Sequence, residues 1–114
     1  MVALSIFIGG ALGAMVRYLF VYFIPLNSLF AVMMVNIIGS FLIGYLAYFQ
    51  QSPLWLFLAV GFCGSLTTFS TFSMDVVRLI SSGFIFKAML YIALTNGLSV
   101  LSCYCGFTLR RLLS

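Results

Sequence analysis

The chain consists of four long apolar runs separated by short polar breaks. A run of about 20 apolar residues is long enough to cross a membrane as a helix. The breaks hold residues that favour turns: Pro25, Asn27 and Ser28, then Gln50 to Pro53, then Ser81 to Gly83. Loops this short force neighbouring helices to run antiparallel. The pattern predicts a single domain, residues 1–114, with both termini on one side and spans over about 2–24, 29–49, 54–80 and 84–109.

The third run differs from the others because it contains a dense polar tract. Ser or Thr occupies positions 65, 67, 68, 70, 71 and 73, with Phe69 and Phe72 among them. Hydroxyls at membrane depth need a partner or a water-lined surface. Because Gly61 and Gly64 precede the tract, we expect the third helix to be broken near positions 64–68. Half-helix ends expose backbone groups that make ion sites, so the tract is predicted to line a path or a binding site.

The composition places the chain in the membrane class. Hydrophobic residues make up 65% and charged residues 5%, whereas ordinary globular chains carry about 25% charged residues. The net charge of +4 comes mostly from cations at segment ends, where membrane proteins place them, which argues against nucleic-acid binding. The first run has no basic leader and contains Arg17, so we expect a retained helix rather than a cleaved signal peptide. The predicted class is an all-α integral membrane protein.

The basic residues outside the first span are balanced between the two sides. Arg110 and Arg111 fall on the side of the termini, and Arg78 and Lys87 on the opposite side. The positive-inside rule therefore assigns no orientation. Equal counts are expected of a chain that inserts in both orientations, but so few charges also give a noisy count, and both interpretations stay open here.

An oligomer is predicted because four helices of this size bury little surface on their own. Small residues suited to close helix contact recur at i and i+4 in the first two runs. The pairs are Gly9 with Gly13, and Ser40 with Gly44.

Asn36 lies in the middle of the second run and shares a helix face with Ser40 and Gly44. A buried Asn offers two donors and an acceptor. An isolated Asn in a membrane helix more often bonds a neighbouring helix than a ligand. Its alignment with other polar groups favours a functional role here.

Tyr91, Thr95 and Ser99 follow one another at i, i+4 and i+8 on the fourth run. They predict a hydroxyl stripe about 12 Å long at 1.5 Å per residue. A single hydroxyl in a membrane helix is usually satisfied by its own backbone. Three in register, opposite a hydroxyl-rich third run, predict a polar track.

The remaining candidates are two aromatic rings and the charges within the runs. Phe69 and Phe72 share a face; core packing is the usual role of Phe, but the electropositive ring edge can also meet an anion. Arg17 is the one charge well inside a span and should face a vestibule or the bundle interior. Asp75, near the end of the third span, is expected to pair with Arg78. A path with donors and no acids suits a small, strongly hydrated anion.

Other functional classes fit the residues less well. Cys63, Cys103 and Cys105 have no zinc-type spacing and the chain has no histidine, so we interpret them as apolar fillers. With a single carboxylate, an enzyme would lack the usual groups for acid–base chemistry. A small multidrug-type, proton-coupled transporter is the alternative of similar size, but it needs an acid at membrane depth, where the first run has Arg17. A structural assembly factor would not explain the aligned hydroxyls.

Four segments resemble the Fluc-type (CrcB) fluoride ion channels, and the resemblance covers essentially the whole chain. They are GGALGAMVRY at 9–18, NIIGSFLIG at 36–44, GFCGSLTTFSTFS at 61–73, and the Tyr91–Thr95–Ser99 spacing. The resemblance implies an antiparallel, dual-topology homodimer with two pores and four transmembrane helices per chain, the third broken. Its implied function is passive export of fluoride from the cytoplasm across the bacterial plasma (inner) membrane.

The resemblance also implies roles for single residues. Asn36 would contact the ion, the phenylalanine ring edges would line the pores, and the fourth-span stripe would be the polar track, with Arg17 in the vestibule. The family further holds a structural sodium ion at the dimer two-fold axis through backbone carbonyls, which match Gly64 and Thr67. Carbonyl oxygens suit a hard cation such as sodium. The implied pathway residues are Asn36, Phe69, Ser70, Thr71, Phe72, Tyr91, Thr95 and Ser99.

Overall fold

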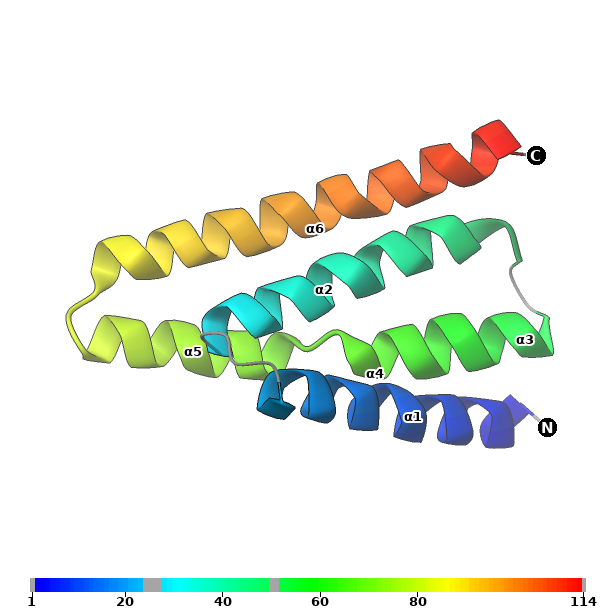
Figure 1. The fold of residues 1–114 in the computed structure, drawn as a ribbon, viewed down its shortest axis with the longest axis horizontal. Helices are drawn as coiled ribbons and strands as arrows, with labels where there is room; N and C mark the ends of the chain where they lie inside the picture. The colour runs from blue at the N-terminus through cyan, green and yellow to red at the C-terminus, as the bar shows by residue number, and fades with distance from the viewer. Residues whose placement is uncertain (1, 24–27, 50–51, 114) are drawn as a thin grey trace.

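The computed structural model describes residues 2–23, 28–49 and 52–113. These residues form helices joined by short connections and contain no strand, which confirms the all-α prediction. The helices run back and forth along the longest axis of the molecule, and both termini lie at the same end (Figure 1). The predicted turn residues Pro25, Asn27, Gln50 and Gln51 lie outside the described residues.

Three helical stretches are long and apolar enough to cross a membrane: Val2–Phe23, Pro53–Ser81 and Ile85–Leu113. The first is α1 and the last is α6. The second predicted span, about 29–49, corresponds to α2 (Ser28–Tyr45) followed by a 3-10 helix at Leu46–Phe49. Tightening of the final turn in this way is common at α-helix ends.

The fourth helix extends beyond its predicted end at residue 109. α6 continues to Leu113 and holds Arg110 and Arg111 in its last turn. Cations there interact favourably with the negative end of the helix dipole. Arg110 also lies over the ring of Tyr45, with 5.8 Å between the guanidinium carbon and the ring centroid.

The third stretch is made of several helical pieces. It opens on Ser52, whose hydroxyl accepts a hydrogen bond from the Trp55 amide at 3.0 Å, with Pro53 in the first turn. After α3 (Pro53–Trp55) the backbone widens into a π-helix at Leu56–Cys63, followed by α4 (Gly64–Leu66) and α5 (Phe69–Ser81). Figure 1 shows α4 and α5 joined by a short non-helical trace.

The predicted turn at 81–83 joins α5 to α6 through a glycine in the left-handed region. Gly83 has φ +86°, its amide donates to the Ile80 carbonyl at 3.0 Å, and the Phe84 amide donates to the Leu79 carbonyl at 2.9 Å. This pair of bonds is the Schellman motif, which satisfies carbonyls at the helix end.

Glycines bring the helices together in two pairs. A Cβ on Gly9 or Gly13 of α1 would collide with the Phe57 or Phe62 carbonyl oxygen of the π-helix. A Cβ on Gly44 of α2 would likewise collide with a carbonyl oxygen of α6. Gly9, Gly13 and Gly44 therefore serve packing within one chain.

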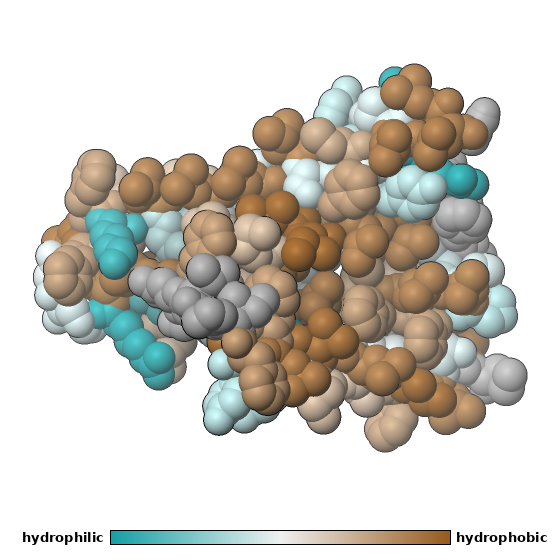
Figure 2. All heavy atoms as spheres, viewed as in Figure 1, coloured by the Kyte–Doolittle hydropathy of each residue, from teal (hydrophilic) through white to brown (hydrophobic). Residues whose placement is uncertain are grey.

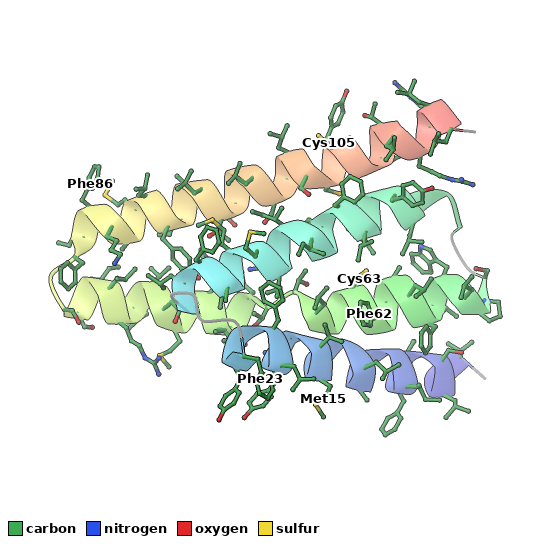
Figure 3. The ribbon with its side chains drawn as sticks, in the orientation of Figure 1. Met15, Phe23, Phe62, Cys63, Phe86 and Cys105 are labelled. Atoms are coloured by element: carbon green, nitrogen blue, oxygen red, sulfur yellow. The ribbon has the colours of Figure 1, made fainter. Side chains whose placement is uncertain are left out.

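The outer surface of the bundle is apolar between its two ends. Figure 2 shows hydrophobic residues over the middle of this face and hydrophilic ones mainly toward its ends. Side chains such as Met15, Phe23 and Phe86 point away from the bundle (Figure 3) and are 57, 68 and 78% exposed. The buried cluster of Val32, Phe72 and Tyr91 joins α2, α5 and α6.

Gly106 of α6 offers a test of the glycine packing. A Cβ there would meet the backbone of Phe41 and Tyr45, which cannot rotate away. We expect Gly106→Ala to destabilise the protein by about 2 kcal/mol, as overpacking does. Gly97→Ala on the same helix is the matched control, because nothing lies within 4 Å of its added Cβ. Equal thermal stability of the two variants in detergent would contradict close α2–α6 contact.

Candidate functional site

The helical backbone of the third stretch is interrupted at Thr67 and Thr68. Both residues are extended, with φ, ψ of −76°, 152° and −145°, 122°, and α5 begins at the next residue. Gly39 of α2 leaves space for this segment, because a Cβ there would collide with the Thr67 methyl group. The interruption leaves backbone groups without their usual helical partners, and each needs another.

Asn36 supplies partners for Thr68. The Thr68 amide donates to Asn36 Oδ1 at 2.8 Å, and Asn36 Nδ2 donates to the Thr68 carbonyl at 3.3 Å. The side-chain amide thus bonds both backbone polar groups of one extended residue, as a neighbouring strand would. Both residues are buried, so Asn36 holds the interrupted segment against α2.

The Thr68 side chain caps α5. Its hydroxyl oxygen accepts from the Thr71 amide at 3.3 Å, as expected of an N-cap threonine. The same oxygen lies 3.3 Å from both the Ser70 and Thr71 hydroxyl oxygens. The first turn of α5 is therefore held by a small network of hydroxyls.

Arg17 satisfies a carbonyl on the other side of the interruption. Its Nε donates to the Ser65 carbonyl at 3.0 Å. In a continuous helix that carbonyl would accept from Phe69, which here begins the next helix. The cation thus lies at the C-terminal end of α4, where the helix dipole is negative.

A polar cavity of about 300 Å³ lies beside the interruption, between α2, the third stretch and α6. Figure 3 shows Cys63, one of its lining residues, pointing toward α2. None of its lining residues is Asp, Glu, Lys or Arg. Predicted residues brought together here are Asn36, Gly64, Thr67, Phe69, Phe72, Thr95 and Ser99; the others lining the cavity are Gly39, Ser40, Ile43, Ala59, Cys63, Thr68 and Asn96.

Two hydroxyls of this cavity have no hydrogen-bond partner within the described part of the chain. They are Thr95 Oγ1 and Ser99 Oγ, both shielded from solvent. Leaving a buried hydroxyl unpaired costs about 1–3 kcal/mol. Two such groups one turn apart, on residues that line the same cavity, are suited to a polar guest such as water or an ion.

Tyr91 does not line the polar cavity, although it shares the predicted stripe. Its hydroxyl donates to Asp75 Oδ2 at 3.2 Å, so the Asp75 carboxylate bonds Tyr91. Arg78, the expected partner of Asp75, interacts with the same carboxylate electrostatically. Tyr91 instead borders an apolar groove of about 330 Å³ with Leu29, Phe30, Met33, Lys87, Leu90 and Leu94.

Phe69 and Phe72 lie in very different surroundings. Their ring centroids are 5.6 Å apart, yet Phe69 is 75% exposed and Phe72 only 6%. Phe72 also contacts the Tyr91 ring, at 5.1 Å between centroids. Phe72 therefore has the packing role usual for Phe, although it also borders the polar cavity. Phe69 lines the same cavity but is exposed at the surface of the chain.

A second cavity, of about 350 Å³, lies on the side of α1. We call it the Arg17 cavity; its other lining residues are Tyr18, Val21, Tyr22, Val32, Thr68 and Thr71. Arg17 and Thr71 are therefore separated from the other predicted pathway residues. Ser70 lines neither cavity within the described part of the chain.

Two polar residues of the site, Thr68 and Asn96, were given no individual role in the sequence prediction. Thr68 bonds Asn36 and lines both cavities. Its position before a helix-forming stretch was a recognisable N-cap signal. Asn96 is an amide within an apolar run, as Asn36 is, and its Nδ2 donates to the Ile92 carbonyl at 3.0 Å.

Comparison with known proteins places this arrangement in a family. The family model described as CrcB-like protein, Camphor Resistance (CrcB), matches residues 4–107. A relative from Sulfurihydrogenibium sp. is 39% identical, with 96% of this chain and 97% of the relative aligned. One from Ignicoccus hospitalis is 43% identical, with 87% and 86% aligned. Both carry the name fluoride-specific ion channel FluC. The chain thus belongs to the CrcB family and is a multi-pass membrane protein.

Proposed function

We propose that this protein is a fluoride channel that lets the ion leave the cytoplasm passively. The observation that carries the proposal is the pair of unpartnered hydroxyls of Thr95 and Ser99, two residues that line a cavity without charged residues. The names of the relatives support the choice of fluoride. They are named as ion channels, a class distinct from enzymes.

The lining of the polar cavity suits an anion that is costly to dehydrate. Hydroxyl and amide donors replace the hydrogen bonds that the ion gives up with its water. Asn36 retains one donor for this purpose, because its amide group has two N–H bonds and the Thr68 carbonyl takes one. The Thr95 and Ser99 hydroxyls would add two more donors along α6.

The ring edges of Phe69 and Phe72 would complete the anion environment. Ring edges carry positive potential and contribute no acceptor that would repel the ion. The exposed position of Phe69 places its ring where an entering ion, or a second chain, would meet it. Ser70 and Thr71 would contribute hydroxyls at the start of α5.

An antiparallel homodimer would close the open side of the polar cavity. Asn96 lines this cavity and is exposed within the apolar α6, where lipid offers its amide no hydrogen bond. Phe69 is exposed beside the same cavity. Balanced basic residues at the two ends of the bundle support insertion in both orientations. Two such chains would contain two pathways.

A structural sodium ion at the dimer axis fits the backbone at the interruption. The Thr68 amide, which would bond the Gly64 carbonyl in a continuous helix, donates to Asn36 instead. The Gly64 carbonyl is thereby released, and Thr67, extended at the end of α4, offers a second. Carbonyl oxygens are ligands that a hard cation prefers. When bound, sodium would link the two chains by accepting these carbonyl oxygens as ligands.

A small multidrug-type transporter is not favoured. Proton coupling needs an acid that the substrate can reach at membrane depth. Asp75 is the one acidic residue in the chain. It bonds Tyr91 and is not among the residues that line the polar cavity.

Anion efflux from liposomes tests the proposed function directly. Purified protein should release trapped fluoride much faster than trapped chloride, because the cavity offers compact neutral donors that suit a small anion. Protein-free liposomes give the leak rate. Equal efflux rates for fluoride and chloride would show that the protein is not a fluoride-selective channel.

Asn36→Asp tests whether Asn36 lies on the pathway. A carboxylate would remove the amide donors and place a like charge beside the ion, which costs several kcal/mol at protein dielectric values. We expect fluoride efflux to fall at least about a hundredfold. Size-exclusion chromatography of the variant checks that it still assembles. A well-assembled variant with wild-type flux would remove Asn36 from the pathway.

Exchange of sodium for a bulky organic cation tests the proposed cation site. Without sodium, the carbonyls of Gly64 and Thr67 lose their shared ligand, so we expect a smaller dimer fraction on dilution in detergent and a slower fluoride efflux. Potassium serves as a control for ionic strength. Indifference of both readouts to the exchange would count against these two residues.

A further inference from the structure

The polar cavity and the Arg17 cavity meet at one residue. Thr68 is the residue that lines both, among all described residues assigned to either. On α2, Val32 borders the Arg17 cavity and Asn36, one turn later, borders the polar cavity. On α5, the neighbours Thr71 and Phe72 face opposite cavities. The two spaces therefore lie on either side of the helix interruption.

Thr68 is held firmly in this position. Its amide and carbonyl both bond the Asn36 side chain, at 2.8 and 3.3 Å. Its hydroxyl is shared with the Thr71 amide and with the Ser70 and Thr71 hydroxyls. A residue fixed through its backbone and its side chain does not swing aside easily. Any passage between the two spaces would run past Thr68, so the volume of its side chain would limit what passes.

The two cavities differ in charge. The guanidinium of Arg17 uses its Nε–H on the Ser65 carbonyl and carries four further N–H donors. A cation in a low-dielectric surrounding raises the local concentration of anions. The polar cavity offers neutral donors instead. Each space could hold several water molecules at about 30 Å³ each, so a hydrated anion could collect at Arg17 before losing water.

We propose that the two cavities are successive compartments of one anion pathway and that Thr68 is the partition between them. The inference rests on the proposed channel function and adds a residue that limits the size of the passing ion. The Thr68 methyl group excludes larger anions by its volume, while the Thr68 hydroxyl stays bonded at the start of α5 and holds the side chain in place. Arg17 attracts the anion on one side, and Thr95 and Ser99 receive it on the other.

Thr68→Ser tests the partition by removing the methyl group while keeping the hydroxyl that caps α5. In efflux from liposomes, we expect chloride release to become measurable and the fluoride-to-chloride rate ratio to fall about tenfold or more, since one methyl group in a fitted site gives discrimination of that size. Ser73→Ala is the matched control: it shortens another side chain of the same tract that lines neither described cavity. Its ratio should equal that of the wild type.

The outcomes separate this inference from the proposed function. If the wild type releases fluoride selectively and Thr68→Ser keeps the same fluoride-to-chloride ratio, Thr68 is not the partition, and the proposed channel function is unaffected. If the wild type releases no fluoride, the proposed channel function and the role of Thr68 are both wrong. Should Thr68→Ser fail to assemble, Thr71→Leu fills the Arg17 cavity instead. We then expect fluoride efflux to drop about tenfold or more, because the larger side chain takes up space in the cavity and one hydroxyl donor is lost. Wild-type flux in this variant would show that the two cavities are not successive parts of one pathway.

Discussion

The structure depends on the hydrogen-bonded pair between the Asn36 side chain and the Thr68 backbone. Interrupting a helix inside a membrane leaves polar groups that lipid cannot satisfy, at a cost of several kcal/mol each. The amide of Asn36 bonds one donor and one acceptor of the extended residue. Arg17 bonds the Ser65 carbonyl beyond it. With these partners in place, the interruption can be tolerated and the polar cavity can exist beside it.

One consequence is that groups expected to act on the ion also hold the protein together. Asn36 uses two of its bonding positions on Thr68, and Arg17 uses its Nε on Ser65. Phe72 belongs to the buried cluster with Val32 and Tyr91. Substitution of such a residue affects both the path and its support. Thr95 and Ser99, which have no partner among the described residues, are the groups most free to serve the ion alone.

The helices and the polar tract could be predicted from the sequence because both are local patterns. The turn at Gly83 and the apolar runs follow from single residues and their periodicity. The division of the hydroxyl stripe could not be predicted, since Tyr91 turns to Asp75 only because α5 packs against α6 there. The partner of Thr68 depends on which helix lies opposite, a contact 32 positions apart in the chain. Helical spacing puts Thr71 and Phe72 on different faces of α5. Which cavity each residue lines depends on the neighbouring helices and could not be predicted from the spacing.

The length of α6 has a consequence for the surrounding membrane. Its 29 residues, Ile85–Leu113, are about 44 Å long at 1.5 Å per residue, more than the hydrocarbon thickness of about 30 Å. A helix longer than the local hydrocarbon core tilts or extends into the headgroup region to match the bilayer. Since α6 carries Thr95 and Ser99, its tilt would set the depth at which these hydroxyls lie. Lipid thickness thereby becomes a variable to which transport should respond.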